Sequence, residues 1–82
     1  MKAKRKKRLY QARTKVMKAL AQPVRMEIAD LLKEREFCVE DIARKVGAER
    51  SNVSRHLSVL SSAGLVEGRK EGLNVFYRLK VP

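Results

Sequence analysis

Residues 51–65 read SNVSRHLSVLSSAGL. Val53, Leu57 and Leu60 are spaced i, i+4 and i+7, which gives a helix one apolar face. The other early positions carry short or forked hydrogen-bonding side chains: Ser51, Asn52, Ser54, Arg55 and His56. We therefore expect a helix over residues 51–63 that packs on a core through one face and presents hydrogen-bonding groups on the other.

The residues before this helix predict a partner helix and a tight turn. Glu40 and Asp41 place two acids at the positive N-terminal end of a helix that runs to Val46, and Gly47 is a suitable C-terminal cap. Two helices joined by a short glycine-containing turn form a helix-turn-helix. In that motif the first turns of the second helix read bases in the DNA major groove. The polar residues in 51–56 are therefore candidate DNA contacts.

After Gly64 the apolar period changes from 3.6 to 2. We expect a strand over 65–69, a turn over 70–72 and a second strand over 74–80, with one apolar face made by Leu73, Val75, Tyr77 and Leu79. Such a hairpin forms a wing, and Arg69 and Lys70 at its tip are candidate phosphate contacts. The predicted fold class is mainly α with a small β-hairpin, a winged helix-turn-helix.

Two further helices are predicted before this unit. One begins at about Arg8 and ends at Gln22, and the next begins at Pro23, which suits a first helical turn. Phe37 to Val39 should form a short extended link. The expected organisation is a flexible basic arm over 1–7 and a single domain over 8–82.

The net charge of +11 is concentrated near the N-terminus. Residues 1–26 hold ten of the twenty Lys and Arg and none of the nine acids. A concentrated basic segment indicates a polyanion partner, here double-stranded DNA, with Lys4 and Arg5 as candidate contacts. An anionic membrane surface and a merely solubilising tail are the alternatives for this segment.

Length and composition exclude several classes of protein. A chain of 82 residues makes one small domain, and no apolar run approaches the roughly 18 residues of a membrane span. There is no phosphate-binding glycine loop and no suggestive pair of nucleophile and base, so we expect no enzyme, cofactor or small-molecule substrate. The lone cysteine and the lack of a secretory signal indicate a cytoplasmic protein with no membrane partner.

The run from about Lys18 to Lys80 resembles the ArsR/SmtB family of winged-helix repressors. The resemblance is carried by ALAQPVRMEI at 19–28, VSRHLSVL at 53–60, GLV at 64–66 and VFYRL at 75–79. It implies a homodimer that binds an inverted-repeat operator and represses transcription until an inducer, often a metal ion or metalloid, releases it.

Two family features are missing from this sequence. Cys38-Val39-Glu40 begins the family's Cys-Val-Cys metal site without completing it, and Cys38 and His56 are the only cysteine and histidine, so we expect no metal site. The chain also stops at Pro82, before the family's final helix, and so resembles a short form. The dimer interface would then fall to the first helix, through Leu9, Tyr10, Val16, Met17 and Leu20.

Several residues have a second interpretation. Cys38 is either a semi-buried structural thiol or a redox switch. His56 is either a DNA contact or a histidine at the core edge, and Arg55 is either a base or phosphate contact or a surface ion-pair partner. For the whole chain, the predicted function is a sequence-specific, dimeric transcriptional repressor. The alternative is an architectural or protein-interaction winged helix that binds DNA nonspecifically.

Overall fold

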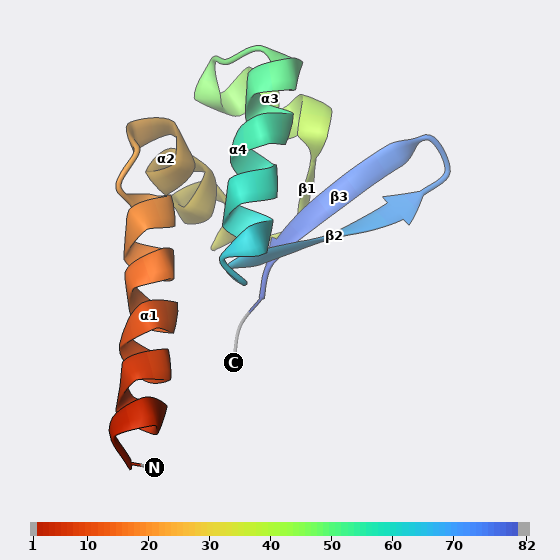
Figure 1. Ribbon diagram of the computed structural model, residues 1–82. Helices are drawn as coiled ribbons and strands as arrows, with labels where there is room; N and C mark the ends of the chain where they lie inside the picture. The colour runs from red at the N-terminus through yellow and green to blue at the C-terminus, as the bar shows by residue number, and fades with distance from the viewer. Residues whose placement is uncertain (1, 81–82) are drawn as a thin grey trace.

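The computed structural model describes residues 2–80, with side chains from residue 6 onward. Four helices and a small sheet follow in the order α1 (Lys2–Leu20), α2 (Pro23–Leu32), β1 (Phe37–Cys38), α3 (Val39–Val46), α4 (Arg50–Ser62), β2 (Val66–Glu71) and β3 (Asn74–Leu79). In Figure 1, α1 stands apart as a long column beside α4, and the β2–β3 hairpin projects from the opposite side of the molecule. The fold is a winged helix-turn-helix, as the sequence predicts.

The junctions between helices follow from local chemistry. Pro23 begins α2, and the side-chain oxygen of Gln22 accepts a hydrogen bond from the backbone N–H of Arg25 at 2.9 Å, which caps the helix. Helix α3 ends at Gly47, whose φ of 68° lies in the left-handed region that glycine adopts without strain. The backbone then enters α4 at Arg50, so the predicted helix-turn-helix is confirmed.

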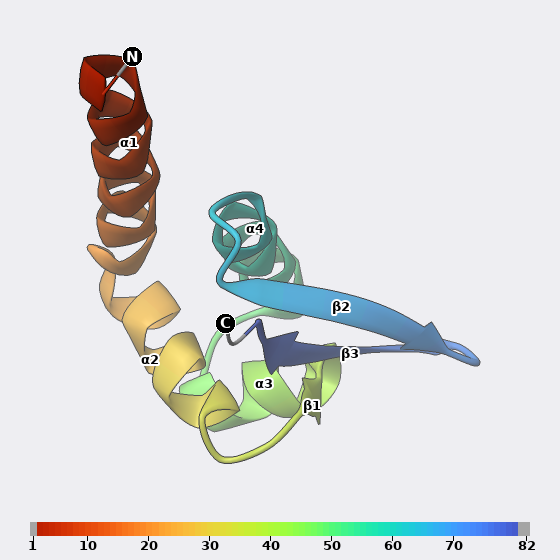
Figure 2. The same cartoon turned by 90° about the horizontal axis from the view of Figure 1, so that it is seen from below.

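The core lies where α2, α3, α4 and the sheet meet (Figure 2). Val53, Leu57 and Leu60 are fully buried, which confirms the apolar face predicted for α4. The other large side chains buried with them are Ile28, Phe37, Ile42 and Val66. Helix α4 is thereby fixed on one side, and its polar side is left at the surface.

The sheet has three antiparallel strands in the order β1-β3-β2, one more than the predicted hairpin. Phe37 pairs with Tyr77 and Cys38 with Phe76, so the expected extended link is a strand. Two residues are too few for a period-2 pattern to show, and their partner strand lies far along the chain.

The turn of the hairpin also differs from the prediction. Glu71 pairs with Asn74, so the strands continue past the expected turn and only Gly72 and Leu73 connect them. Gly72 has a φ of 61°, as a two-residue hairpin turn requires. Leu73 is therefore at the tip with 96% of its surface exposed, and its predicted place on the apolar face is wrong.

Helix α1 begins at Lys2, whereas the sequence predicts a flexible arm over 1–7 and a helix from about Arg8. The predicted start of the helix is wrong, because residues 2–7 form part of the helix although they show no apolar periodicity. Lys, Arg and Ala nevertheless have high intrinsic helix propensity, so the helix extends through them.

Candidate nucleic-acid interface

Four of the five candidate residues on α4 lie on its solvent side. Ser51, Asn52, Ser54 and Arg55 are exposed, while Val53 between them is fully buried. All four lie in the first two turns of the helix, the part that enters the major groove in helix-turn-helix proteins. The structure therefore brings together a short polar surface suited to reading base edges.

Arg55 and Asn52 are linked within this surface. Arg55 Nη2 donates to Asn52 Oδ1 at 2.8 Å, across one turn of the helix. Asn and Arg are the side chains that most often make paired hydrogen bonds to adenine and guanine in the major groove. The contact orients both groups and leaves the other guanidinium donors and the Asn52 amide N–H groups for a partner.

His56 lies on a different side of α4 from these four residues. It is half-buried, and its Nδ1 lies 3.3 Å from Arg25 Nη1 on α2. Desolvation lowers the pKa of His56, and the positive charges of Arg25 and then Arg55 lower it further. Of the two interpretations of His56, its position favours the histidine at the core edge, because residue 56 is three positions after Val53 and borders the buried stripe, so grouping it with the outward residues is wrong.

Arg25 connects three helices at this point. Its Nε donates to the carbonyl oxygen of Ala19 at the end of α1, at 2.6 Å, while its Nη1 meets His56 on α4. Arg25 is not among the candidate residues expected from the sequence, because it has no periodic partner. Its position just after a capped helix start was the available signal, since the cap fixes its backbone.

On the wing, Arg69 is held by acids rather than free at the tip. It forms ion pairs with Glu36, from the segment before β1, and with Glu71, and its guanidinium lies 5.0 Å from the centre of the Phe76 ring. The hydrogen bond from Arg69 lowers the pKa of Glu36, and those to Glu36 and Glu71 raise the pKa of Arg69. A phosphate would have to compete with both carboxylates for this side chain.

Lys70 is exposed and, within residues 6–80, has no carboxylate within ion-pair distance. It is therefore the more available of the two predicted wing cations. The side chains of Lys4 and Arg5 lie outside the described residues.

The predicted dimer residues divide into two groups. Leu9, Tyr10 and Met17 are 49%, 59% and 70% exposed, whereas Val16 and Leu20 are partly buried. Leu20 packs on the core of its own subunit. The first three leave an apolar strip along α1 with no cover from the described part of the chain.

Cys38 is half-buried in β1, directly before α3. No group of three or more His, Cys, Asp or Glu among the described residues is placed to hold a metal ion. Within the same range, no helix is long and apolar enough to cross a membrane.

Residues 22–68 match the sequence profile described as the bacterial regulatory protein, arsR family. The match covers more than half of the chain, from the start of α2 into the wing. The chain belongs to the arsR family. The matched residues include the helix-turn-helix formed by α3 and α4, whereas α1 and the wing residues Arg69 and Lys70 lie outside the match.

The relatives that the chain resembles include mycobacterial HTH-type transcriptional regulators. The chain is 40% identical over 75 residues to the uncharacterized HTH-type transcriptional regulator Rv0081 of Mycobacterium tuberculosis, covering 90% of this chain and 66% of that protein. It is 37% identical over 71 residues to the HTH-type transcriptional repressor SmtB of the same species, covering 87% of this chain and 53% of that one. The chain therefore spans less than two thirds of the length of these relatives.

Among solved structures, the homodimeric winged helix-turn-helix DNA-binding domain of Mb0332 from Mycobacterium bovis, described as a possible ArsR-family regulator, superimposes with a TM-score of 0.89. It is 42% identical to this chain and covers 94% of it, while 71% of the Mb0332 chain is covered. HlyU from Vibrio cholerae superimposes with a TM-score of 0.84 at 32% identity, with 88% of this chain and 78% of HlyU covered.

Proposed function

We propose that this arsR-family chain is a sequence-specific transcriptional repressor that binds double-stranded DNA as a homodimer. The observation that carries the proposal is the division of α4 into a fully buried apolar face and an exposed polar one. A helix anchored in this way presents Asn52 and Arg55 in a fixed orientation, as base reading requires. Family membership likewise points to regulation rather than catalysis.

The remaining DNA contacts in this proposal are electrostatic. Ser51 and Ser54 lie next to Asn52 and Arg55 in the sequence and can hydrogen-bond to phosphates. From the wing, Lys70 contacts phosphates, and so does Arg69 once its ion pairs with Glu36 and Glu71 are broken. The basic N-terminal segment, which includes Lys4 and Arg5, adds sequence-independent attraction. In this proposal His56 holds α4 against α2 through its contact with Arg25 and does not contact bases.

The homodimer follows from the exposed apolar strip of Leu9, Tyr10 and Met17 on α1. Two-fold pairing of this strip would place two α4 helices against symmetric half-sites, hence an inverted-repeat operator. The homodimeric state of the Mb0332 domain supports dimerisation, while the use of this strip as the interface rests on its exposure alone. Replacement of Met17 by Glu should shift the sedimentation equilibrium from dimer to monomer, while Glu at exposed Gln11 should shift it much less.

The decisive experiment is selection of bound sites from a random duplex DNA pool at near-physiological salt, followed by sequencing. Enrichment of an inverted repeat with half-sites about one helical turn apart is expected. Strong retention of DNA without any enriched sequence would instead favour the architectural alternative, in which the basic N-terminal segment supplies the main contact.

A further inference from the structure

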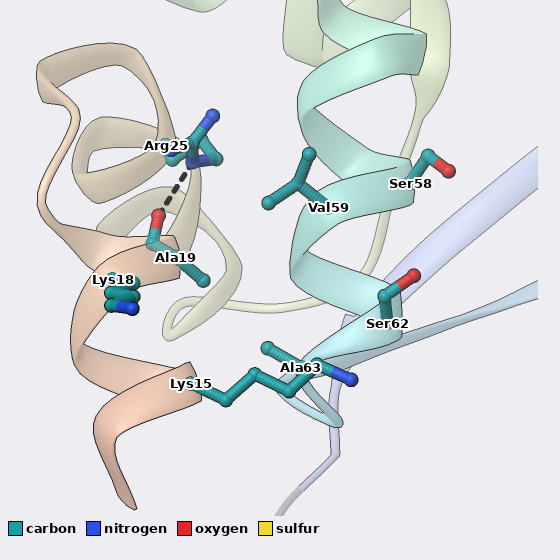
Figure 3. Close-up of a pocket in the computed structure, with 8 residues that line it drawn as sticks. All are labelled: Lys15, Lys18, Ala19, Arg25, Ser58, Val59, Ser62 and Ala63. Atoms are coloured by element: carbon teal, nitrogen blue, oxygen red, sulfur yellow. Dashed lines mark hydrogen bonds between the residues drawn. The ribbon is translucent and has the colours of Figure 1, made fainter. Parts of the chain in front are cut away.

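A cavity of about 330 Å³ lies between α1 and the C-terminal half of α4. It is lined by Lys15, Lys18, Ala19, Arg25, Ser58, Val59, Ser62 and Ala63. In Figure 3, Lys15 extends from α1 toward Ala63, Val59 faces α1, and the hydroxyls of Ser58 and Ser62 point away from α1. The volume is near the lower end of the range for small-ligand sites, which is roughly 300–1,000 Å³.

The lining combines three cations with an apolar wall. Lys15, Lys18 and Arg25 contribute positive charge, and no acidic residue lines the cavity. Within residues 6–80, none of these three has a carboxylate within 4.0 Å, whereas Lys33, Arg44, Arg50, Arg69 and Arg78 all do. The positive charge around the cavity is therefore available to an anion from outside this part of the chain.

Arg25 is already oriented for such an anion. Its Nε and Nη1 are engaged by Ala19 and His56, and Nη2 donates no hydrogen bond to any of the described residues. A guanidinium fixed by two contacts loses little further conformational entropy when its remaining N–H groups bind a ligand. The same group joins α1 to α4, so a ligand on Arg25 acts directly on the position of α4.

The apolar part of the lining indicates that the anion carries a hydrocarbon group. Ala19 is buried, Ala63 is half-buried, and Val59 is 38% exposed on the surface of α4. A bare phosphate would leave this wall uncovered, whereas a carboxylate with a short hydrocarbon body would cover it and place its charge among the cations.

We propose that this cavity binds a small organic carboxylate with an apolar body, and that its occupancy alters the seating of α4 against α1. The binding step does not depend on the proposed function of the protein. Its consequence for DNA affinity does rest on that function, because only a DNA-reading α4 would report the change.

The test uses octanoate as the probe and the full chain, uniformly labelled with ¹⁵N, in a titration followed by NMR. Octanoate should shift the backbone amide signals of Ala19, Val59 and Ala63, while octanol and inorganic phosphate at the same concentrations should not. The double variant K15Q/K18Q should weaken octanoate binding by roughly tenfold, equivalent to about 1.4 kcal/mol. The matched control K33Q changes a lysine that is paired with Asp30 on α2 and should leave the affinity unchanged.

Four results would overturn the proposal. Phosphate that binds as well as octanoate would indicate a bare cationic surface. Unchanged affinity in K15Q/K18Q, or shifts centred away from the cavity, would place the carboxylate elsewhere. Absence of any shift would mean that the cavity is closed in solution, for example by a second copy of the chain.

DNA affinity is measured separately, by fluorescence anisotropy with the selected site. Octanoate binding without any sequence-specific DNA binding would leave the cavity proposal standing and refute the proposed function. Sequence-specific DNA binding without octanoate binding would refute the cavity proposal and leave the proposed function standing.

Discussion

The guanidinium of Arg25 lies 3.3 Å from His56, through Nη1 and Nδ1, and its Nε also donates to the carbonyl oxygen of Ala19. Arginine is always a donor, so Nδ1 accepts and the neutral ring carries its proton on Nε2. A protonated His56 has no acceptor to offer and would face Arg25 as a like charge. The link between α2 and α4 therefore depends on a neutral His56.

Acidification should weaken the fold through this residue. The folded state holds the pKa of His56 below its ordinary value of 6.5, so the unfolded chain takes up this proton first as the pH falls. Its contribution to stability is complete above pH 6.5 and is lost as the pH falls through the lower folded pKa. Urea unfolding between about pH 8 and about pH 5 should show this loss.

The matched variant is His56→Asn, whose Oδ1 offers an acceptor near the position of Nδ1 without titrating. Its free energy of unfolding should depend less on pH than that of the native protein in this window. Glu36 does not interfere, because its lowered pKa confines its own effect to below its ordinary value of 4.5. An equal pH dependence in the two proteins would show that His56 is not responsible.

Two leucines at opposite extremes of burial test the core. Leu57 is fully buried in α4, whereas Leu73 at the wing tip is 96% exposed. Leu57→Ala should lower the free energy of unfolding by about 2–5 kcal/mol, because it removes buried methyl groups and leaves a cavity. Leu73→Ala should change it by less than about 0.5 kcal/mol. Similar losses in urea unfolding would contradict the packing described for α4.

Arg55→Ala tests base reading by α4. Binding to the selected DNA site should weaken by about 1–3 kcal/mol, and the preference for bases at one position of each half-site should relax. Fluorescence anisotropy with the selected site and with single-base variants measures both effects. The control Lys33→Ala, which removes a cation from the end of α2, should leave site preference intact. A uniform loss across all DNA sequences would assign Arg55 to the phosphates.

Glu36→Gln tests whether the acids restrain the wing. Glu36 and Arg69 form an ion pair, and its removal should leave the guanidinium freer to contact a phosphate. DNA affinity at low salt should then rise, and the slope of log affinity against log salt should steepen by about 0.9 for one added phosphate contact. Glu27→Gln, which changes an exposed acid on α2, serves as the control. A fall in affinity would mean that Glu36 orients the wing for binding.

The structure separates what the sequence determines from what it leaves open. The buried stripe of α4, the glycine cap at Gly47 and the proline start at Pro23 are all readable from the sequence, because each depends on spacing within one helix or on the conformation of one residue. The same local logic identifies the exposed positions of Ser51, Asn52, Ser54 and Arg55. Their DNA contacts remain predictions.

Only the tertiary structure decides the remaining features. Three contacts each join residues more than 30 positions apart. They are the pairing of β1 with β3, the contact of His56 with Arg25, and the ion pair of Arg69 with Glu36. Helical and strand periods describe the direction of a side chain relative to its own element, and they carry no information about which group from another element lies opposite. The packing of the elements against one another sets the ion-pair and hydrogen-bond partners of each side chain. The sequence therefore determines which residues of α4 lie on its polar face, and the tertiary structure determines which of them remain free to contact DNA.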